Sequence, residues 1–77
     1  MPLYMLRATH QPQECEESFR VWEKTKDQFD VKTNFCTCPH GVHGGFLLVE
    51  DESADVLERK GKPFPDTIEI HGPGEYV

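Results

Sequence analysis

The spacing of hydrophobic residues changes along the chain and separates strands from helices. Residues 3–9 form a short apolar run in which two sets of side chains alternate, the period of a β-strand. From Glu14 the apolar positions recur every three or four residues, which predicts an amphipathic helix of about three to four turns. The stripe of this helix consists of Cys15, Phe19, Trp22 and Lys26.

The second half of the chain predicts three more strands and a short helix. Residues 31–37 alternate and are rich in β-branched and aromatic side chains, as in a strand. Residues 44–50 are almost continuously apolar, which favours a central strand covered on both sides. A helix of barely two turns is expected over 54–60, and residues 66–70 form the last strand before a tail at 75–77.

This order of elements predicts an α+β fold of the ferredoxin-like βαββαβ type. Such a fold has a four-stranded antiparallel sheet, with strand order 4-1-3-2, and two helices on one face. We found no internal repeat, linker or composition change, so we expect residues 1–77 to form a single domain.

The segment 36–45 concentrates the chain's candidate chemistry. It holds two thiols and two imidazoles and ends in Gly44-Gly45, which we expect at a bulge or a tight hairpin entry. In the predicted topology His10 and Cys15 reach the same end of the sheet, whereas His71 falls at the other end. Thiolates and imidazoles bind transition metals, so a site for Zn, Ni or Cu is our leading interpretation. Its candidate ligands are His10, Cys36, Cys38, His40 and His43.

Other interpretations of these residues stay open. The Cys-x-Cys and His-x2-His spacings are not those of a zinc finger. Cys15 belongs to the apolar stripe and is expected to be a small core residue; the alternative is a thiol activated by the helix N-terminus. The sequence does not decide which face of the sheet carries Cys36 and Cys38, and His40 fits an exposed turn.

Charge and cysteine content limit the partners and the compartment. The net charge of −6 and the pI of about 5.0 would repel a phosphate backbone, which excludes nucleic acid as a main partner. No run of eighteen apolar residues is present, and residues 1–6 are too short for a signal peptide, so we expect no membrane insertion. Three cysteines, an odd number, fit a reducing cytoplasm with free thiols.

Residues 36–50 resemble a group of short uncharacterised bacterial proteins. In that group a strand ends in a cysteine. It is followed by a Gly-Val-His-x-Gly segment and then by an apolar strand that ends in Val-Glu. In this chain Gly41 to Gly45 match the segment, and Phe46 to Glu50 match the strand. The segment from His10 to Cys15 is similar to the group's His-Pro-x-x-x-Cys, except that Gln11 separates His10 from Pro12. The resemblance covers about half of the chain and implies a ferredoxin-like fold without an established activity. A small dimeric nickel-binding α+β group is similar in fold alone, which makes metal binding an expectation by analogy.

Two alternatives to metal binding remain, and whether the protein is an enzyme stays open. One is a small-ligand-binding or enzymatic module in which His10 or His43 acts as an acid or base at a cleft. The other is a structural or interaction protein with incidental cysteines, while a redox role for Cys-x-Cys is weaker. Under each of them we expect a homodimer, because one face of the sheet has no helices and apolar residues line it.

Overall fold

The computed structural model describes residues 1–75, so the tail expected at 75–77 lies, beyond Glu75, outside the described residues. The predicted order of elements is confirmed. The elements are β1 (Leu3–Thr9), α1 (Cys15–Thr25), β2 (Asp30–Cys36), β3 (Gly44–Glu50), α2 (Ala54–Gly61) and β4 (Thr67–Gly74), with short 3-10 turns η1 (Pro12–Glu14), η2 (Lys26–Gln28) and η3 (Cys38–His40). The main difference from the sequence prediction is β4, which continues past residue 70 to Gly74.

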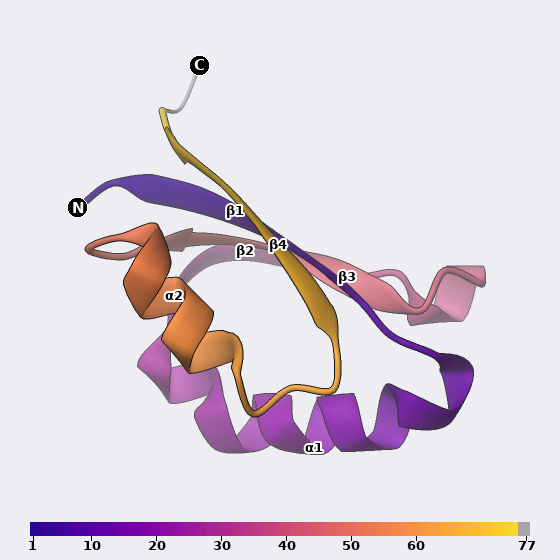
Figure 1. Ribbon diagram of the computed structural model, residues 1–77. Helices are drawn as coiled ribbons and strands as arrows, with labels where there is room; N and C mark the ends of the chain where they lie inside the picture. The colour runs from indigo at the N-terminus through magenta and orange to yellow at the C-terminus, as the bar shows by residue number, and fades with distance from the viewer. Residues whose placement is uncertain (76–77) are drawn as a thin grey trace.

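The strands form one antiparallel sheet in the order β2-β3-β1-β4. Counted from the β4 edge, this is the predicted order 4-1-3-2. Both helices lie on the same side of the sheet, α1 along its length and α2 beside one end (Figure 1). The α+β architecture with two helices is therefore confirmed. This topology brings the end of β1, the start of α1 and the β2–β3 loop to one end of the molecule.

The strand register assigns side chains to the two faces of the sheet. Leu6 of β1 lies opposite Leu47 of β3 and Ile70 of β4, and directly opposed residues in an antiparallel pair point to the same face. Leu6 is buried, so this is the face that the helices cover. Cys36 lies opposite Gly45, two residues from Leu47, and belongs to the same face. A register shift between Val31 and Thr33 interrupts the simple alternation expected in β2.

The core is small and lies mainly where α2 meets the sheet. Its buried members are Tyr4, Leu6, Phe29, Val49 and Leu57. Val49 and Leu57 are fully buried, whereas none of the α1 residues, all of which the structure describes, is buried. The long helix is therefore held against the sheet with little packing of its own.

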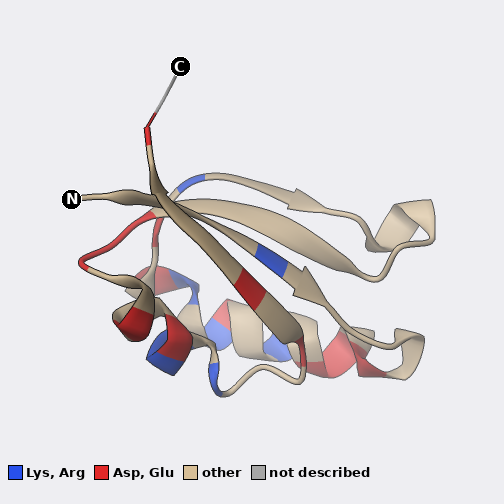
Figure 2. Ribbon diagram, turned by 45° about the horizontal axis from the view of Figure 1, so that its top comes forward, with Lys and Arg blue, Asp and Glu red and all other residues tan. Residues whose placement is uncertain are grey.

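Charged residues are concentrated in the helices and their connecting loops, and the strands contain few of them (Figure 2). Among the described residues, no helix is long and apolar enough to cross a membrane.

Candidate metal centre

The first pair of candidate ligands comes from the junction between β1 and α1. His10 follows the last residue of β1, and Cys15 is the first residue of α1. The turn η1 between them is closed by the backbone N–H of Gln11, which donates to Oε1 of Glu14 at 2.8 Å. Pro at its first position suits a helical start, because the missing N–H would have no partner there. The tight turn places Sγ of Cys15 3.2 Å from Nε2 of His10.

The second pair comes from the loop between β2 and β3. Cys38 begins η3, and His43 immediately precedes β3. The loop is fixed to its surroundings by main-chain hydrogen bonds: the N–H of Thr37 donates to the carbonyl of Gly44 at 3.0 Å, and the N–H of His10 donates to the carbonyl of His43 at 3.1 Å. The second of these bonds joins the two ligand-bearing segments directly.

Gly44 makes the close approach of the loop to β1 possible. Its φ is +147°, and a Cβ there would lie 2.0 Å from the carbonyl oxygen of Ala8. Only glycine fits both the backbone conformation and the space. The N–H of Gly44 also donates to Sγ of Cys38 at 3.4 Å. The expected tight entry into β3 thus has a role in positioning a candidate ligand.

The two pairs meet in one cluster. His10, Cys15, Cys38 and His43 each offer one ligand atom, and these four atoms all lie within 4.8 Å of one another. Sγ of Cys15 is 2.9 Å from Nδ1 of His43 and 4.0 Å from Sγ of Cys38, which is in turn 3.5 Å from Nε2 of His10. With typical zinc bond lengths, the edges of a tetrahedral Cys2His2 site are about 3.3–3.8 Å. The observed separations scatter around these values.

A buried carboxylate orients the first histidine. Oδ2 of Asp66, just before β4, lies 2.8 Å from Nδ1 of His10, and the two side chains are 2% and 5% exposed. The hydroxyl of Ser18 donates to the other oxygen of Asp66 at 2.7 Å. A carboxylate can only accept, so the His10 proton belongs on Nδ1 and the Nε2 lone pair points at the cluster. This arrangement matches the carboxylate–histidine–metal pattern of metal sites.

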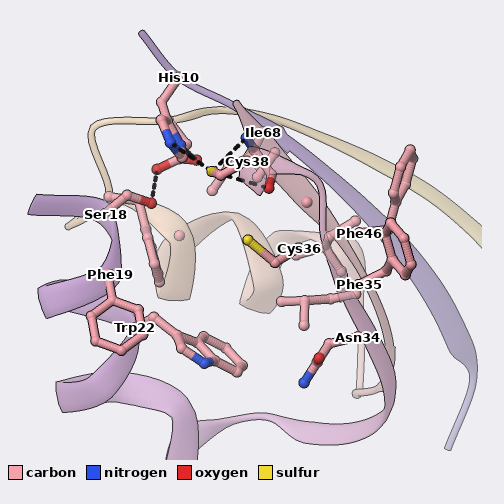
Figure 3. A pocket seen from close by; sticks show the side chains of 18 of the residues that line it. His10, Ser18, Phe19, Trp22, Asn34, Phe35, Cys36, Cys38, Phe46 and Ile68 are labelled. Carbon is pink, nitrogen blue, oxygen red and sulfur yellow. Dashed lines mark hydrogen bonds and ion pairs between the residues drawn. The ribbon is translucent and has the colours of Figure 1, made fainter. Parts of the chain in front are cut away.

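Three of the five ligands predicted from sequence, His10, Cys38 and His43, are in the cluster. Cys36 is exposed, and its side chain points into a neighbouring cavity (Figure 3). His40 is exposed and its ring stacks on Phe35 with a centroid separation of 6.0 Å. Among the described residues, the cluster does not include Cys36 or His40.

The fourth candidate ligand of the cluster, Cys15, is the residue that the sequence pattern assigned to the core. A signal for it does exist in the sequence. His10 and Cys15 are five positions apart, and Cys38 and His43 have the same separation in the reverse order. Asp66 was missed as well, because nothing in the local sequence connects it with a residue 56 positions away.

No model of a protein family matches the chain, and a search of curated proteins found no match. The resemblance of residues 36–50 to short bacterial proteins therefore stays a prediction.

Proposed function

We propose that this protein binds a single transition-metal ion through His10, Cys15, Cys38 and His43, with Zn²⁺ as the best match. The observation that carries the proposal is the convergence of these four ligand atoms within 4.8 Å of one another, from two segments far apart in sequence. The cluster has few N–H and S–H protons with which to form hydrogen bonds between its ligand atoms. The Cys15 thiol has one proton and lies within reach of ring nitrogens of both His10 and His43, so it cannot donate to both. A cation in place of the thiol protons would satisfy all four groups.

The donor set favours zinc over other metals. Two thiolates and two imidazoles in a tetrahedral arrangement are typical of zinc, whereas nickel and Cu(II) prefer tetragonal sites richer in nitrogen and oxygen. Cu(I) is the main competitor because it also accepts thiolates. An iron–sulfur cluster fits less well, since its ligands are distributed over more than one iron ion and would not crowd around one point.

Four protein ligands fill a tetrahedral site and leave no position for a substrate, so the proposed role is to hold the metal, as in structural or sensing sites. Metal binding would then be coupled to folding of a chain with a small core. Free thiols require a reducing environment, which supports the cytoplasm. The strand order and the placement of both helices on one face support a ferredoxin-like assignment for the scaffold.

The test is metal analysis of untagged protein, followed by titration of the metal-free protein with Co²⁺ as a spectroscopic substitute for zinc. We expect one metal per chain and the intense d–d and thiolate charge-transfer bands of tetrahedral Cys2His2 coordination. Cys15→Ser and His43→Ala should lose these bands. Cys36→Ser and His40→Ala are the matched controls and should keep them. Loss of the bands in the controls but not in Cys15→Ser would disprove the proposed ligand set.

A second candidate function is favoured by one observation. Cys15, His10 and Asp66 form a continuous thiol–imidazole–carboxylate chain, the arrangement of cysteine nucleophiles. In this chain the Cys15 proton would pass to Nε2 of His10, and Asp66 would stabilise the imidazolium. The first residue of a helix also suits a thiolate. This function requires the metal-free protein, because a metal-bound thiolate is not free to attack.

Alkylation kinetics separate the two functions. In metal-free protein, a nucleophilic Cys15 should react with iodoacetamide faster than the more exposed Cys36, and His10→Ala should abolish that advantage. Slower alkylation of Cys15 than of Cys36, together with stoichiometric metal, would leave metal binding as the function.

A further inference from the structure

Helix α1 leaves a space between itself and the sheet. Its apolar stripe faces the sheet, as predicted, but Phe19 remains 64% exposed and no residue of this fully described helix is buried. The fully buried side chains, Val49 and Leu57, lie elsewhere. Side chains of the chain itself therefore do not fill the region beneath α1.

A cavity of about 260 Å³ occupies this space. Its walls are mainly apolar and come from α1, the sheet and the segment before β4. They include Leu6, Trp22, Phe29, Leu47, Phe64 and Ile68. A dry engineered cavity of about 150 Å³ holds one benzene molecule, so this cavity has room for a molecule of about two fused rings. The cluster of His10, Cys15 and Cys38 closes one end of it (Figure 3).

Two neutral polar side chains from β2 point into the cavity. Figure 3 shows the Cys36 sulfur directed into the space between β2 and the facing helix, and Asn34 lines the same cavity. Both are exposed, so the cavity opens along the edge strand β2. The Asn34 amide makes no hydrogen bond to another described residue and is free to meet a polar group of a ligand.

The charges around the cavity exclude an anionic ligand. Among the described lining residues, Asp66 is the only acidic or basic side chain besides the imidazole of His10. Asp66 is 2% exposed and already accepts from His10 and Ser18, so it is not available to a ligand. No lysine or arginine of the described chain lines the cavity, and the protein has a net charge of −6. A carboxylate or phosphate entering this cavity would lose its hydration without gaining a counter-charge.

We propose that this cavity binds a small, uncharged aromatic molecule of one or two rings with a single hydrogen-bonding group that meets Asn34. An aromatic ligand is favoured over an alkyl chain because one wall is itself aromatic. The rings of Trp22 and Phe29 lie 5.9 Å apart and are tilted by 37°, an arrangement that a further ring extends with favourable edge and face contacts. Three of the four proposed ligands close one end of the cavity, but the apolar walls and Asn34 are not ligands, so the inference does not depend on the metal.

The test is an NMR titration of isotope-labelled protein with 2-naphthol, in metal-free and zinc-treated samples. Trp22 is the only tryptophan of the chain, so its indole N–H gives a single assigned signal inside the cavity. We expect this signal and the amides of residues 34–36 to shift in a saturable, one-to-one manner. The anion 2-naphthoate, which has the same rings, should bind more weakly.

Two substitutions that add the same ring to β2, one inside the cavity and one on the opposite face, serve as test and control. Cys36→Phe places a ring in the cavity and should weaken 2-naphthol binding at least about tenfold, in line with steric mismatch in apolar pockets. Thr33→Phe adds the same ring to the other face of β2 and should leave binding unchanged. If Cys36→Phe does not fold, the exposed position Asn34→Trp serves as a second blocking variant.

Three results would overturn the proposal. They are no saturable shift of the Trp22 signal in folded wild-type protein, unchanged affinity in both blocking variants, and equal or tighter binding of 2-naphthoate or of 1-octanol.

Discussion

Nδ1 of His10 lies 2.8 Å from Oδ2 of Asp66, a contact between the first and last thirds of the chain. The carboxylate holds the imidazole with its Nε2 lone pair toward Cys15 and Cys38. Asp66 is itself held by Ser18 of α1. The orientation of one candidate ligand therefore depends on three separate elements of the fold.

Replacing Asp66 should weaken metal binding without removing a ligand. Partners of metal-bound histidines typically contribute about 10- to 100-fold to affinity, so we expect Asp66→Asn to raise the zinc dissociation constant by that factor. Competition with a chromophoric chelator measures it. Glu69→Gln, an exposed carboxylate on β4, is the control and should leave affinity unchanged. Equal affinities for Asp66→Asn and wild type would show that the contact does not support the site.

Zinc should stabilise the folded protein against heat and urea. A ligand that binds only the folded state at 100 times its dissociation constant adds about 2.7 kcal/mol to the free energy of unfolding. We expect this gain in wild type and in Cys36→Ser, and its absence in Cys15→Ser and Cys38→Ser. Urea unfolding with and without zinc is the measurement. A gain of the same size in Cys15→Ser would contradict the assignment of that thiol.

Gly44 should tolerate no side chain. Gly44→Ala would bring its Cβ against the carbonyl of Ala8, at a backbone conformation that disfavours L-residues. We expect it to lower the free energy of unfolding by more than about 2 kcal/mol and to weaken metal binding, because the loop carrying Cys38 and His43 must move. Gly74→Ala, where an added Cβ meets nothing within 4 Å, is the control for stability. Similar losses in both variants would show that the crowding at Gly44 is not the cause.

Acid should remove a stabilising contribution from Asp51. Burial acts to raise the pKa of this carboxyl, but hydrogen bonds from Lys60 and from the N–H of Glu52 outweigh it and hold the pKa below its usual value. A carboxyl with a lowered folded pKa stabilises the protein above its unfolded pKa of about 3.9, and that contribution is lost as the pH falls through the folded value. The acid limb of a pH–stability curve should therefore be shallower in Asp51→Asn.

The loss of stability in Asp51→Asn near neutral pH should be about 1–3 kcal/mol, the usual cost of breaking a buried charged hydrogen bond. Urea unfolding at several pH values gives the curve. Asp55→Asn, on the exposed side of α2, should keep the wild-type slope. If Asp51→Asn keeps the wild-type slope of stability against pH, Asp51 is not the source of the loss of stability in acid.

The open face of the sheet should pair with a second copy of the chain. On this face the apolar side chains of Met5, Phe35 and Phe46 are 38%, 57% and 39% exposed. Arg7 lies opposite Glu69 on the same face. Two copies related by a two-fold axis can therefore place apolar groups against apolar groups and opposite charges against each other. Phe35→Glu should shift the protein to a monomer in sedimentation equilibrium. Val42→Glu, an equally exposed apolar position in the β2–β3 loop, should not. A monomeric wild type at high concentration would refute the dimer.

Local sequence patterns were sufficient for the type and order of the elements of this fold, whereas the strand order was expected only from the assumed topology. The alternation in β1 and the stripe of α1 reflect one face turned toward the core, which leaves a direct trace in the sequence. The apolar run of β3 predicted cover on both sides, and this is wrong in the described chain, because Phe46 is 39% exposed on the face without helices. The face of Cys36 was not predictable, because the irregular register of β2 changes the alternation that the assignment depends on.

The composition of the site was harder to predict than its place in the fold. Topology alone brings His10, Cys38 and His43 to one end of the sheet. Cys15 lies on an apolar stripe, and a stripe residue is expected to be buried; its availability depends on how far α1 stands from the sheet, which periodicity does not encode. Asp66 contributes through a contact across 56 residues, for which no local pattern exists.

A metal ion bound by both ligand pairs would restrict the conformations of the unfolded chain. Cys15 and Cys38 are 23 residues apart, and a metal bound between them closes that loop as a disulfide would. For a loop of this length, the chain-entropy treatment of cross-links gives about 3 kcal/mol of stabilisation. The enclosed segment contains all of α1 and β2, and neither element has a buried residue. The ion would thus act as a reversible cross-link around about a third of the chain, a part whose helix and strand have no buried residue to hold them in place.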